Sequence, residues 1–456
     1  MLQAKETRNR LTSNGVDMFI GSVEFVDGDD EGSDVTLRIC RPTECVELRA
    51  RHAAIASGSR PNRPPELRPG IPLPFLKGRI VTASEMALVA LPTSIAIIGG
   101  GVIAVEYATV FAQLGVGVSL ICTENEFLPF LEKEIRQSLR MRMSREHILF
   151  VRESVREIQV GNSSIGVVLN PSKLQIERDK EKGKASPERR LKVDIVLYSG
   201  GRNANSEGLG LESVNVSTTK YGRIVVDPTF RTTSRSNIYA IGDVIGPPGL
   251  ASAAQQHGRS LSERLFGMSG DDEDAIEVID FEEFSDERDD FFSHADSGAS
   301  SVSEDSHSEA EETLFGAASG AQTMDAPLTL WTLPEIASVG VTLAQASVDK
   351  SKLIVEGRAF FKDMARGRLS GDSQGYVKIV ARMDAKRHTI VGVHIIGEGA
   401  NELIQLGSIL VHSGASLESV SRTPFAAVTL SGIYQMACDD ALLKSPRRKK
   451  SMNISL

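Results

Sequence analysis

The sequence predicts an α/β fold in which a parallel sheet carries a dinucleotide site, with an α+β domain later in the chain. Three observations predict it. An apolar run at 95–98 ends in three consecutive glycines, a segment with helical spacing follows at 102–114, and a second apolar run occupies 116–122. A strand, a glycine turn, a helix and another strand in this order are typical of a parallel βαβ unit.

The glycines form the pattern Gly99-x-Gly101-x-x-Ala104. In such a loop the first glycine makes the tight turn, the second lets a pyrophosphate approach the backbone, and the small third residue permits helix–strand packing. The helix N-terminus adds N–H groups and a positive dipole end. We therefore predict a dinucleotide site here, the competing interpretation being a glycine turn without a ligand.

The chain before this unit is predicted to begin with a helix at 2–14. Strands are expected at 17–26, 34–40 and 53–56, and a Pro-rich linker runs to 78. After the βαβ unit we expect a helix at 131–147 and strands around 148–160, 164–169 and 193–198. The charged stretch 172–190 is read as a solvated hairpin tip.

The later part of the chain is predicted to contain a helix at 250–266 and an α+β domain from 327 to 442. The expected elements of that domain are strands at 358–361, 375–381 and 390–396 and helices at 400–413 and 430–442. Between them, 267–322 is acidic, serine-rich and of low complexity, so we expect a disordered insert.

The whole chain has a formal net charge of −9, and this negative charge comes from the acidic insert. Residues 271–312 hold 18 Asp and Glu against one Arg, a net of −17, which leaves the rest of the chain near +8 (−9 + 17). No apolar run reaches the roughly 18 residues of a membrane helix, and the N-terminal residues do not resemble a secretory signal. The four cysteines are too few and scattered for a disulfide framework or a zinc site. We expect a cytoplasmic protein with no metal, nucleic-acid or membrane partner.

Several segments in order resemble the two-dinucleotide flavoprotein oxidoreductases, the family of glutathione reductase and dihydrolipoamide dehydrogenase, and within it the soluble pyridine nucleotide transhydrogenases. They are IGGGVIAVEYATVFAQLGVGVSL, DIVLYSGGRNANSEGLGLESV, IYAIGDVIGPPGLASAAQQHGR, LPEIASVG, FFKDMARGRLSGDSQGYVKIV and IVGVHIIGEGANELIQLG. The resemblance implies FAD, NAD and NADP as cofactors or substrates. It also implies a Rossmann-like NAD(P) domain inserted in an FAD-binding domain and followed by a dimerisation domain.

The resemblance assigns roles to residues of both nucleotide sites. Glu106 matches the acidic residue beside the nicotinamide ring, and Gly201 and Arg202 match the strip flanking that ring. The residues matched to the FAD site are Ser57 and Gly58 in the Ala-Ser-Gly-Ser crossing, Gly242 and Asp243 at the ribityl chain, and Leu250, Ala251 and Ser252 at a helix facing the flavin.

The sequence also departs from the family. The first strand, Gly-x-Gly-x-x-Gly loop and redox-disulfide helix of the family have no counterpart, so we expect an incomplete FAD-binding domain. The Cys-x4-Cys pair at Cys40 and Cys45 lies in a strand and turn, and we predict two ordinary thiols. The family's His–Glu base pair is matched by Ala427, Val428 and Gly432, none of which can transfer a proton.

Three functions therefore compete. The first, which the departures favour, is FAD-dependent hydride exchange between NAD(H) and NADP(H), with no catalytic side chain of its own. The second is a dihydrolipoamide-dehydrogenase-like reductase, and the third is a nucleotide-binding fragment without turnover. The family also implies a homodimer formed through the last domain.

The stretch after the second βαβ strand predicts the nucleotide preference. A free ribose hydroxyl favours a carboxylate there, whereas a 2′-phosphate favours arginine. Glu124 and Glu126 occupy this stretch, without a basic residue. We predict tighter binding of NAD(H), with Glu124 as the ribose acceptor.

The predicted domains follow from these assignments. They are a partial FAD-binding domain at 1–79 and 221–266, an NAD(P)-binding domain at 80–220, the acidic insert at 267–322, an interface domain at 323–442 and a basic tail at 443–456.

Overall fold

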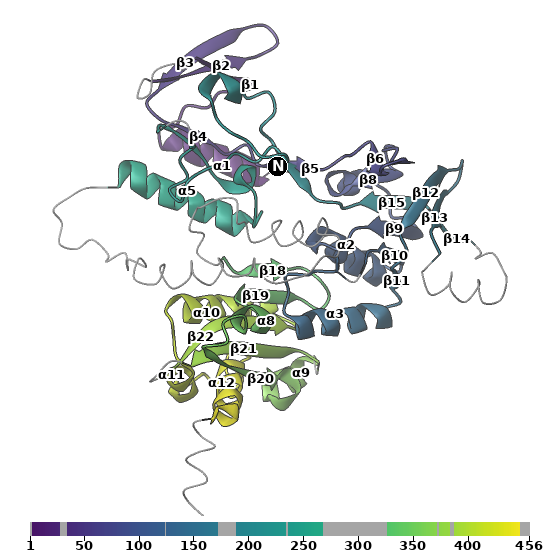
Figure 1. Cartoon of the computed structure of the whole chain (residues 1–456), viewed down its shortest axis with the longest axis vertical. Helices are drawn as coiled ribbons and strands as arrows, with labels where there is room; N and C mark the ends of the chain where they lie inside the picture. The colour runs from purple at the N-terminus through teal and green to yellow at the C-terminus, as the bar shows by residue number, and fades with distance from the viewer. Residues whose placement is uncertain are drawn as a thin grey trace, which may run out of the picture. The chain divides into compact units, whose positions relative to one another are not determined.

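The computed structural model describes residues 2–27, 34–123, 125–171, 188–233, 236–267, 326–371, 374–383 and 387–446. The acidic insert from 268 on, the end of the basic tail and most of the charged hairpin tip lie outside these residues. The described chain forms two compact units: residues up to 60 together with 202–267, and residues 61–201 together with 326–446. The finer domain boundaries remain predictions. Figure 1 labels helices and strands of both units where there is room.

The first unit begins with helix α1 (Leu2–Ser13) and a three-stranded antiparallel sheet. Its strands are β1 (Ser22–Asp27), β2 (Val35–Cys40) and β3 (Cys45–Ala50). The strand predicted at 17–26 starts only at Ser22, which pairs with Cys40, the last residue of β2. Strand β3 was not predicted from the sequence.

Short elements complete this unit. Strands β4 (Ala53–Ile55) and β17 (Ile238–Ala240) form a parallel pair, and β5 (Ser59–Pro61) pairs with β16 (Arg202–Ala204). The turns η2 (Leu211–Val214) and η3 (Gly242–Ile245) precede helix α5 (Ala251–Phe266). The bounds of α5 differ by one residue from those of the helix predicted at 250–266. Buried side chains of these elements form one core that includes Phe25, Ile55 and Leu261.

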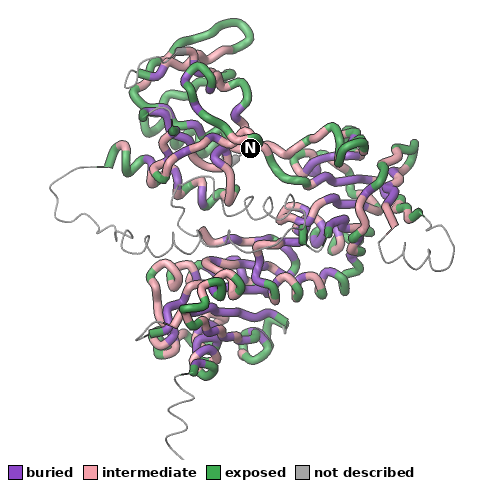
Figure 2. The backbone as a smooth tube through the Cα atoms, in the orientation of Figure 1, coloured by how far each residue is buried: buried purple, intermediate pink, exposed green. Residues whose placement is uncertain are grey.

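The second unit contains the predicted parallel sheet, with strand order β11-β10-β9-β15-β8. The strands are β8 (Ile80–Thr82), β9 (Ser94–Ile98), β10 (Gly117–Ile121), β11 (Leu149–Val151) and β15 (Ile195–Tyr198), all parallel to their neighbours. Helices α2 (Val102–Gln113) and α3 (Lys133–Arg145) follow β9 and β10. The central strands are buried, as Figure 2 shows in purple and as the apolar run at 95–98 indicated.

An antiparallel sheet of β12 (Val155–Val160), β13 (Ile165–Leu169) and β14 (Arg189–Val193) interrupts this pattern. The β13–β14 pairing confirms a hairpin around the charged stretch. The segment read as a linker holds the short pair β6 (Glu66–Arg68) and β7 (Ile71–Pro72), and the turn η1 (Ala83–Leu88) follows β8.

The α+β part of the second unit has an antiparallel sheet in the order β18-β19-β22-β21-β20. Its strands are β18 (Leu328–Leu330), β19 (Ile336–Gly340), β20 (Leu353–Phe360), β21 (Tyr376–Met383) and β22 (His388–Ile396). Its helices are α8 (Leu343–Ala346), α9 (Ala365–Ser370) after the turn η4 (Phe361–Asp363), α10 (Ala400–His412), α11 (Leu417–Arg422) and α12 (Ile433–Lys444). The three predicted strands and two predicted helices are confirmed.

A buried ion cluster joins this sheet to the start of helix α3. Lys378 of β21 is completely buried, and its Nζ lies 3.0 Å from Glu132, 3.2 Å from Glu134 and 2.7 Å from Glu356. Burial lowers the pKa of Lys378, but hydrogen bonds to Glu356 and Glu132 outweigh this and raise it. The cluster fixes the end of the loop that runs from β10 to α3.

Candidate functional site

The glycine loop of the second unit has the geometry that its sequence predicts. Gly99 follows β9 with a φ of 125°, a conformation that favours glycine, and a Cβ there would lie 2.7 Å from the carbonyl oxygen of Ser199. Gly100 lies so close to Glu126 that a side chain would collide with its backbone. Ala104 is completely buried, consistent with a position that must stay small for helix–strand packing.

The N-terminus of α2 is open to a ligand. Gly101 is the N-cap, no side chain caps the helix, and its first turn has no acidic residue. A Cβ at Gly101 would meet no atom within 4 Å, so the surface beside its backbone is free space. Free N–H groups, a positive dipole end and space beside the backbone fit a pyrophosphate group.

Glu106 lies on α2 beyond this loop. Burial raises the pKa of its carboxyl, although the hydrogen bond from the backbone N–H of Trp331 at 2.7 Å opposes this. Trp331 follows β18, is the only tryptophan of the chain and is 63% exposed. Trp331 was not predicted as a site residue. Its position could have indicated it, because Trp331 directly precedes Thr-Leu-Pro-Glu, where a segment that resembles the family begins.

The loop after β10 is described only in part, because Glu124 lies outside the described residues. The carboxylate of Glu126 accepts the backbone N–H of Thr123 at 2.7 Å, so it caps its own loop. The assignment of Glu124 as ribose acceptor remains a prediction.

In the first unit, Ser57 and Gly58 are held by Asn205. The Ser57 hydroxyl donates to the Asn205 carbonyl at 2.7 Å, and the Asn205 side-chain amide donates to the Ser57 carbonyl at 3.0 Å. The Asn205 N–H donates to the carbonyl of Gly58, whose φ is 72°. These bonds fix the crossing from β4 to β5 next to β16.

Ser59 is the centre of the polar cluster in this unit, although the predicted site contained only its neighbours. Its hydroxyl donates to the Asp243 carboxylate at 2.8 Å and accepts from Nε of Arg202 at 2.8 Å. Nη2 of Arg202 also donates to the Ser59 carbonyl at 2.7 Å. A carboxylate held by one hydroxyl keeps acceptor capacity for further hydroxyl groups, as a ribityl chain would require.

Gly242 directly precedes Asp243 in the chain, and helix α5 begins eight residues after Asp243. Gly242 has a φ of 71°, and its N–H donates to Nδ1 of His257 at 3.2 Å. Burial lowers the pKa of His257, so burial favours the neutral ring, whose Nδ1 can accept this hydrogen bond. Leu250 is the N-cap of α5, and Ala251 and Ser252 form its first turn, which has no side-chain cap and no acidic residue. This end can therefore stabilise negative charge on a ring placed before it.

The predicted residues thus fall into two groups. Gly99, Gly101, Ala104, Glu106 and Gly201 belong to the second unit, and the residues matched to FAD belong to the first. Arg202, predicted beside the nicotinamide, is bound to Ser59 of the first unit. Among the described residues, no group of His, Cys, Asp and Glu could hold a metal ion.

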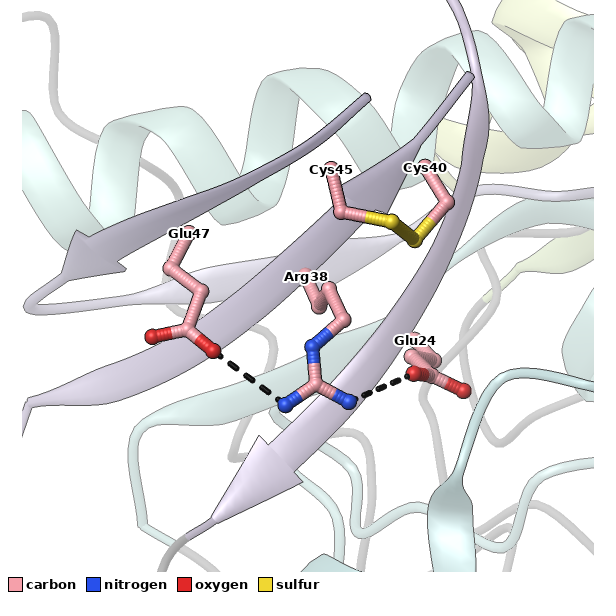
Figure 3. The surroundings of a disulfide bond; sticks show 5 residues. All are labelled: Glu24, Arg38, Cys40, Cys45 and Glu47. Carbon is pink, nitrogen blue, oxygen red and sulfur yellow. Dashed lines mark hydrogen bonds and ion pairs between the residues drawn. A yellow bond between two sulfur atoms is a disulfide. The ribbon is translucent and has the colours of Figure 1, made fainter. Parts of the chain in front are cut away.

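The prediction of two free thiols at Cys40 and Cys45 is wrong, because the structure joins them in a disulfide (Figure 3). The antiparallel register places Cys40 directly opposite Cys45, and the N–H of Arg41 donates to the Glu44 carbonyl to close the turn. Sequence spacing alone did not show that the two residues are cross-strand neighbours. The disulfide lies on the β2–β3 hairpin, where Arg38 of β2 bonds to both Glu24 and Glu47.

The loop matched to the family's catalytic base precedes α12. Val428 is 61% exposed, and neither it nor Ala427 or Gly432 carries a titratable group.

Comparison with known proteins gives the family. The family described as pyridine nucleotide-disulphide oxidoreductase matches residues 2–258, and its dimerisation domain matches residues 326–438. The soluble pyridine nucleotide transhydrogenase of Pseudomonas aeruginosa (strain LESB58) is 31% identical over 94% of this chain and 76% of its own length. That of Pseudomonas putida (strain KT2440) is 30% identical over 96% of this chain and 79% of its own length.

Solved structures show the same fold. LpdA from Mycobacterium tuberculosis matches with a TM-score of 0.74 at 21% identity, covering 97% of this chain and 81% of its own. The flavoprotein disulfide reductase RclA from Escherichia coli matches with a TM-score of 0.72 at 19% identity, covering 97% and 83%. In the described part of the chain, no helix combines the length and apolarity needed to cross a membrane. The chain belongs to the pyridine nucleotide-disulphide oxidoreductase family, a family of flavin-dependent oxidoreductases that bind FAD and NAD(P).

Proposed function

We propose that this protein exchanges hydride between NAD(H) and NADP(H) through bound FAD. The observation that carries the proposal is the loop before α12. At the positions matched to the proton-transfer base and its partner it presents Ala427, Val428 and Gly432, so it offers no group for thiol chemistry. Nicotinamide exchange needs no such base, and relatives about 30% identical to this chain are named soluble pyridine nucleotide transhydrogenases.

We assign the following roles to the residues of the two units. The α2 N-terminus binds a nucleotide pyrophosphate, with Gly101 leaving space for it, and Glu106 orients the carboxamide end. In the first unit, Asp243 would accept hydrogen bonds from hydroxyl groups of FAD, and the α5 N-terminus would stabilise negative charge on its ring. Bound FAD would supply the chemistry of reversible hydride transfer with nicotinamides. The protein supplies positioning and charge stabilisation.

The test is a hydride-transfer assay on the full chain with added FAD. NADPH is the donor and thio-NAD⁺ the acceptor, because reduced thio-NAD⁺ is detected apart from NADPH. We expect FAD-dependent transfer with parallel double-reciprocal plots, as two successive half-reactions require. FAD binding with no transfer would contradict the proposal.

A thiol–disulfide reductase is the second candidate, and the Cys40–Cys45 disulfide is the observation that favours it. A Cys40→Ser variant decides between the two. If nicotinamide exchange is the activity, this variant keeps the transfer rate and loses only the stability that the short loop gives, about 2 kcal/mol. If the disulfide is catalytic, the variant loses NADH-dependent lipoamide reduction that the wild type shows.

We also propose that residues 326–446 form a homodimer interface, as the match to a dimerisation domain supports. Light scattering at micromolar concentration should give twice the chain mass of 49.2 kDa. The mass of a single chain would contradict this proposal.

A further inference from the structure

One side chain of helix α5 accepts a hydrogen bond from the backbone that leads from β17 to Asp243. The N–H groups of Ala240 and Ile241 donate to backbone carbonyls, each at 3.0 Å. The N–H of Gly242 donates instead to Nδ1 of His257 at 3.2 Å. A side chain therefore replaces the backbone as acceptor at the residue directly before Asp243.

Packing holds the His257 ring at this position. His257 is 3% exposed, and the centroids of its ring and the Phe230 ring lie 4.8 Å apart. Helix α5 also comes close to the glycine itself, because a Cβ at Gly242 would lie 3.3 Å from Cβ of Ala254. Ala254 and His257 are three residues apart, so they share one face of the helix. That face holds Gly242 by packing and by a hydrogen bond.

The hydrogen-bond acceptor is what histidine adds at this position. Because Nδ1 accepts, the neutral ring carries its proton on Nε2, and Nε2 is buried without a partner among the described residues. A buried unpaired N–H is unfavourable, and an apolar ring of similar size would fill the space beside Phe230 without one. The bond from Gly242 therefore distinguishes His257 from an apolar residue at the same place.

The residue after Gly242 connects this bond to the cofactor site. The Ser59 hydroxyl donates to Oδ2 of Asp243 at 2.8 Å, so the carboxylate is held from its side chain as well as through its backbone. A group that is fixed before its ligand arrives loses less conformational entropy on binding. We propose that His257 is a positioning residue for FAD, which holds Gly242 so that the Asp243 carboxylate can accept hydrogen bonds from hydroxyl groups of the cofactor. This rests on the proposed function, in which Asp243 belongs to the FAD site.

A double-mutant cycle tests whether His257 acts through Asp243. FAD affinity is measured by flavin fluorescence titration of the full chain for the wild type, His257→Phe, Asp243→Ala and the double variant. Phenylalanine keeps an aromatic ring beside Phe230 but accepts no hydrogen bond from Gly242. We expect His257→Phe to lower FAD affinity about five- to tenfold when Asp243 is present. In the Asp243→Ala background no carboxylate remains to be positioned, so the same substitution should lower it less than about twofold.

A conservative variant separates the hydrogen bond from the ring. In His257→Asn, Oδ1 is two bonds from Cβ, as Nδ1 is in histidine, and can accept from Gly242. Its FAD affinity should stay within about twofold of the wild type. Leu261→Val is the matched control, because Leu261 is buried in the same core and lies one turn further along α5. It should change FAD affinity by the same factor with and without the Asp243→Ala substitution.

Circular dichroism checks that each variant folds. Should His257→Phe fail to fold, His257→Leu, which also lacks an acceptor, takes its place in the cycle. Equal losses of FAD affinity with and without the Asp243 carboxylate would overturn the proposal, because the histidine would then act on the fold as a whole. A loss in His257→Asn as large as in His257→Phe, or a wild type that binds no FAD, would overturn it too.

The measurement needs no turnover, so its outcome is distinct from that of the hydride-transfer assay. A chain that shows the coupling between His257 and Asp243 but transfers no hydride would contradict the proposed function alone. A chain that transfers hydride but shows additive losses would contradict this inference alone.

Discussion

Helices α2 and α5 both begin without a side-chain cap or an acidic first turn, but their surroundings differ. Beside α2, the space at Gly101 is open and backbone N–H groups are the available partners. Before α5, the chain places the Asp243 carboxylate, which Ser59 and Arg202 hold through hydrogen bonds. Under the proposed function, the N-terminus of α2 would bind a doubly charged pyrophosphate, whereas the segment before α5 would bind hydroxyl groups and a weakly charged ring.

The largest expected effect comes from filling the space at Gly101. Its φ of −78° is accessible to any residue and a Cβ meets no atom, so Gly101→Val should fold normally. The added side chain would stand where the pyrophosphate approaches, and we expect NADPH affinity to fall on the order of 100-fold, about 2.7 kcal/mol. Fluorescence titration of bound NADPH measures it.

Gly117→Ala is the matched control, because Gly117 lies in β10 and a Cβ there has only one ordinary contact, 3.5 Å from Thr93. If Gly101→Val binds NADPH as the wild type does, the α2 N-terminus is not the phosphate site.

Removing the carboxylate at the other helix tests the second half of the comparison. Asp243→Asn keeps the shape but weakens hydrogen bonds to a charged acceptor, each worth about 1.5–3 kcal/mol. We expect FAD affinity to fall roughly tenfold to 100-fold, measured by flavin fluorescence, with NADPH affinity unchanged. Equal losses for both ligands would show that the two sites are not separate.

The ion cluster beneath the β10–α3 loop should matter for stability more than for recognition. Replacing Lys378 by Met leaves the buried Glu132 without this cation, whereas Glu134 and Glu356 keep Arg358, and breaking a buried pair costs about 3–5 kcal/mol. Urea unfolding monitored by circular dichroism measures the loss. Arg145→Gln, at an exposed position of the same helix, should change the unfolding free energy by less than about 1 kcal/mol.

The smallest effect is the titration of Glu106. Burial raises its pKa above the ordinary 4.5, so the folded protein binds this proton more tightly than the unfolded chain does. The associated stabilisation is complete at low pH and is lost as the pH rises through the folded pKa. Relative to Glu106→Gln, the wild type should therefore gain stability as the pH falls through the raised folded pKa towards the ordinary value of 4.5. The emission of Trp331, the only tryptophan, should titrate over the same range. A pH-independent difference would contradict the assignment.

The glycine loop could be predicted from sequence because its turn, helix start and packing position lie within six residues of one another. The Ser59 cluster could be predicted only in part, since Ser59, Arg202 and Asp243 come from three distant segments that the fold brings together. Cross-strand register explains the missed disulfide, because only the pairing of β2 with β3 shows that Cys40 faces Cys45.

The most direct test of the central claim separates the two half-reactions by anaerobic stopped-flow spectroscopy. The full chain with bound FAD is mixed first with NADPH and then with NAD⁺, while flavin absorbance is recorded. The account predicts that NADPH bleaches the flavin band and that NAD⁺ restores it, with and without the Cys40→Ser substitution. A flavin that NADPH reduces but NAD⁺ cannot reoxidise, or reoxidation that needs a disulfide substrate, would contradict it.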